Sequence, residues 1–247
     1  MKKRLLILGM IFTMAVSSAG CGSSSSSDNA GRTDKQTATV QDSQKDTSSD
    51  SKSDNDKKDA KYKSADEITM DDLMSHDETP AEDFEFNDSA DEIVIQKYVG
   101  KDPIVVIPDE IDGKKVVGFE SAFTLNNNIV AVKIGNNVQE VEKSAFSGCK
   151  QLKYVVMGDS VKTIGGRMFA QTNLQELVLN DGLQKIGQDD SNNVLAPPSS
   201  NCGMDLKIPE SVTELHVSEF NLIGKSGSYA EQYANEHADA GVTFTAE

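Results

Sequence analysis

The residue types that most often carry catalysis are few in this chain and lie far apart. The three histidines are His76, His216 and His237, and none has a partner at the short spacing that presents two ligands to zinc. The acidic stretch that ends in Asp112-Gly113 does not follow the calcium-loop pattern and instead indicates a turn. Glycine-rich phosphate loops are absent as well. We therefore predict no catalytic residues, no metal site and no cofactor, and we expect that the protein is not an enzyme.

Cys21 is the residue whose surroundings do indicate chemistry. Residues 1–4 are basic and residues 5–16 form an apolar run of 12, typical of a signal peptide and shorter than the roughly 20 residues that span a bilayer. Small residues at 18–20 precede Cys21, which resembles the bacterial lipobox, although Ser18 stands where that motif usually has Leu. The resemblance implies that the Cys21 thiol carries a diacylglyceryl group and anchors the protein on the extracytoplasmic side of the cell membrane, at the cell surface. The alternative is ordinary secretory cleavage nearby, with Cys21 incidental.

The segment that follows is expected to be a flexible tether. Residues 22–63 are rich in Ser, Asp, Lys, Thr and Gln, and such a composition cannot bury enough apolar surface to offset its ordering entropy. As a flexible coil it reaches roughly 35–40 Å. It is neutral, and residues 1–20 carry three basic residues, so residues 64–247, with 32 acidic and 13 basic residues, carry −19 of a formal charge that is −16 for the whole chain. We expect no nucleic-acid partner and no direct contact with anionic lipids, so that the membrane is reached through the lipid anchor only.

An internal repeat organises the rest of the chain. Four segments share the pattern L-x-x-V-x-I, then V-x-x-I, then Phe five residues later, with a period of 22–29 residues. The alternating part predicts a short strand with one buried face, and V-x-x-I predicts a second short strand or turn. Phe146, Phe169 and Phe220 would close their coils, whereas the third repeat lacks its Phe and holds an insertion at 188–204. The repeats begin at Ile129, Leu152, Leu174 and Leu206, after a degenerate copy from Val105.

These residues resemble a known repeat. The segment 145–152, Ala-Phe-Ser-Gly-Cys-Lys-Gln-Leu, resembles the repeat of the BspA-like leucine-rich repeat family of bacterial surface proteins, and so does Ile107-Pro108 followed by 112–116. The tail 227–234 is similar to the family's C-terminal closing element. The resemblance covers about 93–247 and implies an α/β fold, a right-handed leucine-rich repeat solenoid of short strands and turns or short helices. We expect about five coils with an N-terminal β cap and a C-terminal helix-strand cap.

The boundaries of the predicted regions follow from composition and from local signals. Ser64-x-x-Glu67 and Ser228-x-x-Glu231 match a capping box, and we expect a short helix after each serine, the first one indicated by Ile68, Leu73 and Met74. Cys149 lies where small buried residues suit coil packing, and we expect a buried thiol; a disulfide with Cys202 is the alternative. The predicted regions are a signal peptide (1–20), a tether (21–63), an acidic N-terminal cap region (64–103), leucine-rich repeats (104–223) and a C-terminal cap (224–247).

Two places compete as a binding surface. Solenoids commonly bind through the extended face of their stacked strands, and the alternative is that this is an ordinary exposed sheet face. The second place is the insertion at 188–204. The candidate partner-binding face consists of Lys133, Lys153, Tyr154, Val156, Glu176, Val178 and Lys207.

The function expected from these features is adhesion or protein binding. We predict a monomeric, membrane-anchored lipoprotein that displays the repeat module to a protein or cell-surface ligand. The first alternative is an exported enzyme or an accessory subunit of an envelope complex, which would need a pocket with a His or paired carboxylates of shifted pKa. The second alternative is a structural envelope protein that associates with itself through a sheet edge.

Overall fold

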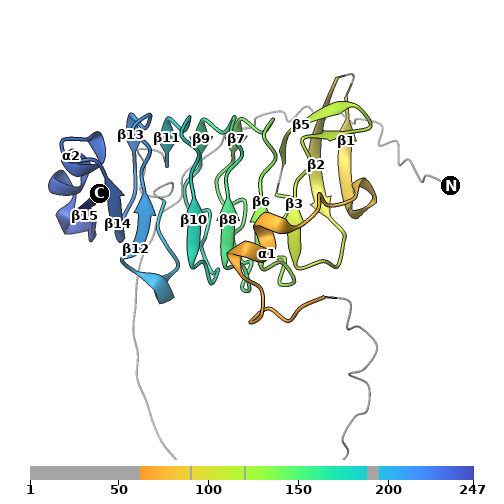
Figure 1. Ribbon diagram of the computed structural model, residues 1–247, viewed down its shortest axis with the longest axis horizontal. Coiled ribbons are helices and arrows are strands. Elements are labelled where there is room, and N and C mark those ends of the chain that lie inside the picture. Colours follow the sequence, from red (N-terminus) through yellow and green to blue (C-terminus); the bar gives the residue numbers. More distant parts are fainter. Residues whose placement is uncertain (1–61, 90, 120, 188–194) are drawn as a thin grey trace, which may run out of the picture. The chain divides into compact units, whose positions relative to one another are not determined.

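The computed structural model describes residues 62–89, 91–119, 121–187 and 195–247 (Figure 1). All of them belong to one compact unit, Ser53–Glu247. The lipid attachment residue Cys21, the signal peptide and almost all of the tether lie outside the described residues, as do residues 188–194 of the insertion. Within the described ranges, none of the helices has the length and apolar character needed to cross a membrane.

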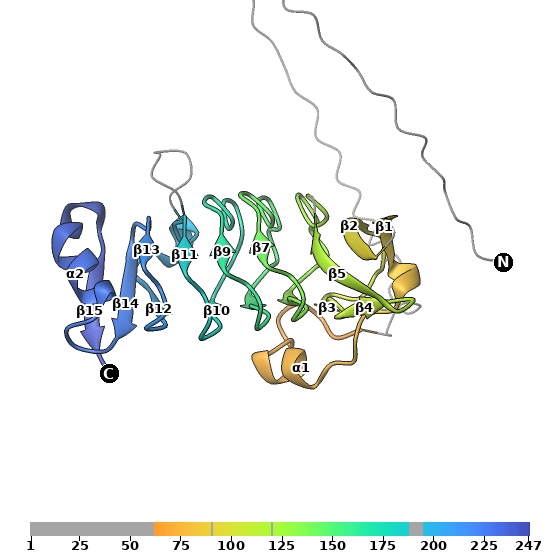
Figure 2. The same ribbon diagram turned by 90° about the horizontal axis from the view of Figure 1, so that it is seen from above.

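The repeats stack into a solenoid with two parallel sheets. The first sheet contains β3 (Ile104–Val106), β6 (Ala131–Lys133), β8 (Tyr154–Val156) and β10 (Glu176–Val178), in that spatial order. The second sheet contains β7 (Glu140–Val141), β9 (Thr163–Ile164), β11 (Lys185–Ile186) and β13 (Glu214–Leu215). The two sheets lie on opposite sides of the core (Figure 2). The predicted solenoid, with two short strands in a coil, is therefore confirmed.

The core is built from one inward-facing side chain of each strand. Val105, Val132, Val155 and Leu177 are partners in register on the first sheet, and all four are buried. On the second sheet, Val141, Ile164, Ile186 and Leu215 are the buried members of their strands. This is the alternation predicted from the repeat, because successive side chains of a strand point to opposite faces.

A ladder of phenylalanine rings fills the space between the two sheets. The rings of Phe123 and Phe146 have centroids 5.5 Å apart, and those of Phe146 and Phe169 lie 6.4 Å apart at an interplanar angle of 6°. Phe119 adds an edge contact to Phe123 at 5.3 Å. All three ladder rings are fully buried. Rings at these separations interact favourably beyond the area that they bury.

Tight turns let neighbouring coils stack closely. A Cβ atom on Gly158 would lie 2.2 Å from the carbonyl oxygen of Gly135, which explains the glycine after the first strand of that repeat. The turns also repeat a left-handed backbone conformation every 23 residues, at Ser121, Ser144 and Arg167, with φ of 53°, 60° and 53°. Residues other than glycine rarely adopt this conformation, so the coil geometry overrides local preference here.

A mixed sheet of four strands forms the N-terminal end of the solenoid. Its strands are β1 (Phe84–Asp88), β2 (Glu92–Tyr98), β5 (Lys114–Phe119) and β4 (Glu110–Ile111), in the order β1-β2-β5-β4. Before it come helix α1 (Met70–Ser75) and a short 3-10 turn, Ala81–Asp83. The expected short helix is present and contains Leu73 and Met74, but its N-cap is Thr69, with Asp72 completing the capping box, and not Ser64. Ser64 and Glu67 do bond to each other, but within a turn.

The C-terminal end is a β-α-β unit. Strand β14 (Phe220–Gly224) pairs in parallel with β12 (Met204–Lys207) on one side and with β15 (Thr243–Ala246) on the other. Helix α2 (Tyr229–Glu236) connects β14 to β15, and the Ser228 hydroxyl caps it by accepting from the amide of Glu231. A final 3-10 turn, Ala238–Ala240, precedes β15.

Two expectations for the last repeats need correction. Phe220 does not close the fourth coil, since it lies in β14 opposite Met204 and thus belongs to the next strand. The coil is shorter than the pattern suggested, because Leu206 and Leu222 are in register. In the third repeat, the insertion places Leu195 in the core with no exposed surface, bonded to the backbone of His216 and Ser218. The described residues of the insertion, 195–204, therefore contribute to the core through Leu195.

Candidate functional site on the outer face of the first sheet

The outward side chains of the first sheet form two rows in register. One row is Ile104, Ala131, Tyr154 and Glu176, and the other is Val106, Lys133, Val156 and Val178. The structure thus brings together five of the seven residues of the candidate partner-binding face. Lys153 directly precedes β8, whereas Lys207 lies on β12, which pairs with β14 in a separate sheet.

The chain's own N-terminal part covers half of this face. Residues 62–79, hereafter the covering segment, place α1 on the outside of the first sheet, away from the second sheet (Figures 1 and 2). Ile68 is 2% exposed and Leu73 is 0% exposed. Both belong to one apolar cluster with outward-facing residues of β3, β6 and β8 and with Val130, namely Ile104, Val106, Val130, Ala131 and Val156.

The covering segment corrects the expectation that the whole column of strands is open to solvent. Val156 is 8% exposed and Lys153 is 9% exposed, so neither is available to an external partner in this arrangement. Lys133 and Tyr154 are half-buried. The physical reason is that an apolar outer row is favourable only when other apolar groups remove it from water.

Lys153 holds the start of the covering segment. Its ammonium group donates to the carbonyl oxygen of Ala65 at 2.8 Å and lies 3.2 Å from a carboxylate oxygen of Asp66. The Lys153 side chain is 11% exposed, whereas that of Asp66 is 99% exposed. The other end is fixed by backbone pairing, since Thr79 and Val106 exchange two hydrogen bonds of 2.9 Å, one through the Thr79 hydroxyl.

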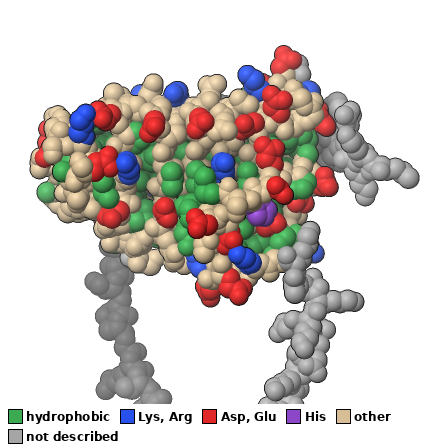
Figure 3. All heavy atoms as spheres, viewed as in Figure 1, with side chains coloured by type: hydrophobic (Ala, Val, Ile, Leu, Met, Phe, Trp, Pro, Cys, Tyr) green, Lys and Arg blue, Asp and Glu red, His purple; other side chains and the backbone are tan. Residues whose placement is uncertain are grey.

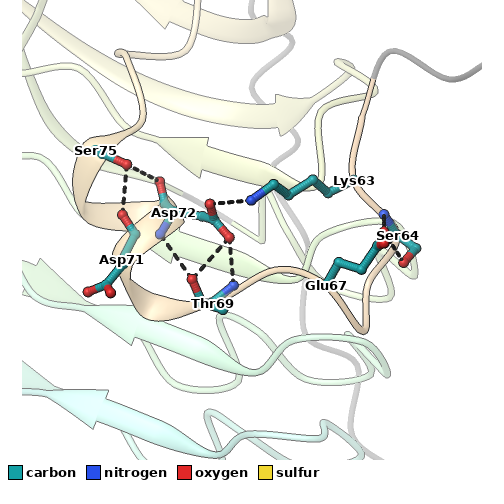
Figure 4. Close-up of polar contacts among 7 residues, drawn as sticks. All are labelled: Lys63, Ser64, Glu67, Thr69, Asp71, Asp72 and Ser75. Carbon is teal, nitrogen blue, oxygen red and sulfur yellow. Dashed lines mark hydrogen bonds and ion pairs between the residues drawn. The ribbon is translucent and has the colours of Figure 1, made fainter.

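Most other polar contacts of the covering segment are internal (Figure 4). The Thr69 amide and hydroxyl both donate to the Asp72 carboxylate at 3.0 Å, and the Ser64 hydroxyl donates to Glu67 at 2.6 Å. The bond from Lys63, followed by those from Thr69, lowers the pKa of Asp72. The two bonds from Ser64 lower the pKa of Glu67. The segment therefore satisfies its own helix start without help from the sheet.

The other half of the face is open. Val178 is 39% exposed, and two charged residues are also exposed, Glu176 on the same strand and Lys207 on β12. Lys207 forms an ion pair of 2.7 Å with Glu247, whose hydrogen bond raises the pKa of the lysine. Figure 3 shows hydrophobic side chains gathered in the middle of this face, with lysines and acidic residues around them. Such a mixed surface can bind a protein through an apolar centre with a polar rim.

The histidines remain dispersed in the fold. His76 lies 3.5 Å from Asp102, His216 lies 3.6 Å from Glu214, and the His237 ring stacks on Tyr233 with centroids 3.9 Å apart. Within the described ranges, no three His, Cys, Asp or Glu side chains come close enough to hold a metal ion.

The Cys149 thiol occupies a structural position. It is fully buried and donates to the carbonyl oxygen of Phe123 at 2.8 Å, as expected for a buried thiol without a disulfide. Burial raises the pKa of Cys149 to about 11, which leaves the thiol protonated and unreactive at neutral pH.

The sequence indicated Ile68 and Leu73 as residues of a short helix but not that they are buried against the first sheet, where they decide which half of the face is open. Their signal was the pair of aliphatic side chains five residues apart in a strongly acidic stretch. Burial of such a pair is favourable, but the neighbouring residues do not indicate which surface of the protein buries it.

Comparison with known proteins agrees with the geometry of the coils. Residues 119–194 match the BspA type leucine rich repeat region, in six copies. A crystal structure of a leucine-rich repeat protein from T. pallidum is 31% identical over 60% of this chain and 71% of that chain, with a TM-score of 0.50. The chain belongs to the BspA-type leucine-rich repeat family. Among curated proteins there is no match. Solenoids of stacked repeats commonly bind partners through an extended face.

Proposed function

We propose that this BspA-type protein is a lipid-anchored extracytoplasmic lipoprotein that displays a protein-binding module. The observation that carries the proposal is the open half of the outer face. The apolar cluster of the covering segment extends as far as Val156 on β8 and includes no residue of β10, where Val178 is 39% exposed. An outer face that served only for internal packing would be covered along its whole length.

The charge of the domain narrows the class of ligand. Residues 64–247 carry 32 acidic and 13 basic residues, which disfavours nucleic acid and anionic lipid as direct partners. A protein or another cell-surface ligand remains, and one with a basic rim would be steered toward the domain. The open face offers an apolar contact at Val178 with Glu176 and Lys207 to fix orientation.

The anchor is tested by replacing the thiol that would carry the lipid. We expect Cys21→Ser to move the protein from the membrane fraction to the soluble or secreted fraction, because acylation needs the sulfur. Cys202→Ser is the matched control, since Cys202 is an exposed cysteine of the folded domain, and it should leave the protein in the membrane fraction. Anchoring is refuted if Cys21→Ser remains in the membrane fraction to the same extent as the control.

The binding face is tested by placing one photo-crosslinking residue on either sheet. A crosslinker at position 178 in the full chain, on living cells, should capture a defined product. The same group at Thr163, on the outside of the second sheet, should not. Glu176→Lys should reduce the capture at 178, because it reverses a charge at the rim. Equal products from both positions, or no dependence on Glu176, would remove the support for this face.

A further inference from the structure

We propose that the outer face of β3, β6 and β8 is a peptide-binding groove. In this structure the covering segment is its resident occupant, and it can exchange for another acidic peptide with two aliphatic anchors five residues apart. The inference goes beyond the proposed function, because it concerns the covered strands and needs neither the lipid anchor nor a cell-surface partner.

The groove is apolar where a freely exposed sheet would be polar. Ile104 and Val106 on β3, Val130 before β6, and Val156 on β8 all point away from the core of the solenoid. The phenylalanine ladder and the inward valines form a separate core cluster that does not include them. These outward residues therefore form an apolar surface of their own, which another apolar element can cover.

The occupant is a self-contained element. Its hydrogen bonds between Thr69 and Asp72, and between Ser64 and Glu67, remain intact if it leaves the sheet (Figure 4). Before Thr79, its polar links to the sheet region include those of Lys153 and the ion pair between His76 and Asp102. The backbone pairing of Thr79 with Val106 then serves as the fixed end. Such a segment can detach without leaving buried polar groups of its own unpaired.

The chemistry of the occupant defines the ligand class. Ile68 and Leu73 fill the apolar surface, and Asp66 places a carboxylate beside Lys153. A basic peptide would bring like charge to the buried Lys153 ammonium, which is unfavourable. The groove thus selects acidic peptides, and a partner that carries such a peptide competes with a segment present at high effective concentration in the same chain.

The test uses the full chain and a fluorescent peptide with the sequence of residues 62–79. Leu73→Asp removes a fully buried anchor of the resident segment, while Met74→Asp makes the same change at a neighbour that is 54% exposed. We expect the Leu73→Asp chain to bind the peptide at least tenfold more tightly than the unmodified chain does. The Met74→Asp chain should bind it no more tightly than the unmodified chain. A peptide that itself carries Leu73→Asp should not bind. The groove is refuted if a folded Leu73→Asp chain binds no more tightly than the Met74→Asp chain.

If the Leu73→Asp chain does not fold, amide hydrogen exchange on the unmodified chain provides a second test. Exchange of the Leu73 and His76 amides, which form the hydrogen bonds of α1, should be faster than that of the β6 and β8 amides, because the segment opens on its own. Protection of α1 equal to that of β8 would mean that the segment leaves only on global unfolding, and that result would overturn the exchangeable occupant. Neither experiment depends on export or adhesion. A negative result would therefore refute the exchangeable segment without refuting the proposed function.

Discussion

Phe146 stands in the middle of the ring ladder, and its replacement tests whether the ladder holds neighbouring coils together. Its ring lies 5.9 Å from that of Phe119, 5.5 Å from Phe123 and 6.4 Å from Phe169. Phe169 is equally buried, but among the described residues its ring contacts that of Phe146 alone. The two positions thus offer the same substitution with different numbers of ring neighbours.

The expected losses follow from burial and from ring contacts. A fully buried Phe→Ala change costs about 3–5 kcal/mol of unfolding free energy, and each ring pair adds about 0.5–1.5 kcal/mol beyond the buried area. Phe146→Ala removes two more ring pairs than Phe169→Ala. We therefore expect Phe146→Ala to be the more destabilising by about 1–3 kcal/mol. Phe146→Leu, which keeps most of the volume, should recover much of the difference.

The assay is urea unfolding followed by far-ultraviolet circular dichroism, because the chain has no tryptophan. Tyrosine fluorescence must give the same midpoint, since repeat proteins can unfold in parts. Val99→Ala, at an exposed position, is the control and should change the unfolding free energy by less than about 0.5 kcal/mol. If Phe169→Ala costs as much as Phe146→Ala, ring contacts do not account for the stability of the ladder.

Three further predictions concern the turns, the covering segment and the buried thiol. Gly158→Ala should destabilise the protein by more than about 2 kcal/mol in the same assay, because its Cβ would lie 2.2 Å from the backbone oxygen of Gly135; a loss no greater than that of Ala at Gly118, where nothing lies within 4 Å, would contradict this. The pKa of Asp72 is lowered by its bonds to Lys63 and Thr69, so its contribution to the stability of helix α1 is present above the ordinary value of 3.8 and is lost as the pH falls through the lowered pKa. Hydrogen exchange at α1, corrected for intrinsic rates, should accelerate below about pH 4, and Asp72→Asn should remove the pH dependence; persistence in the variant would assign it to another group. Cys149 should resist alkylation by iodoacetamide at pH 8 until urea unfolds the chain, because burial raises its pKa to about 11, and mass spectrometry would reveal early modification.

The repeat was predictable because its signal is local and periodic. Val132, Val155 and Leu177 were expected to face the core from the alternation within each repeat, and they pair in register there. The turn glycine after Met157 is explained by close approach of the preceding coil. The same periodic reasoning failed at Phe220, where the coil shortens and the residue enters the following strand. Spacing alone cannot show that a coil has lost part of its turn.

The candidate face was predictable in its register but not in its exposure. The column of Val106, Lys133, Val156 and Val178 follows from the repeat, and the structure has these residues as neighbours. The covering segment was missed because Ile68 lies outside the repeat and contacts strands that are far away in the sequence. Docking of such an element depends on the shape of a surface that exists only after the coils have stacked.

The sequence by itself determined the repeat, the residues of the core and the acidic character of the folded part, because these depend on residue type and short spacing. It also predicts a lipid anchor at Cys21, which lies outside the described residues. Tertiary structure decided that Lys153 holds the chain's own Ala65 and Asp66, and that Val156 is covered while Val178 is open. The physical reason is that burial of an apolar surface depends on which distant element reaches it, and no local pattern contains that information.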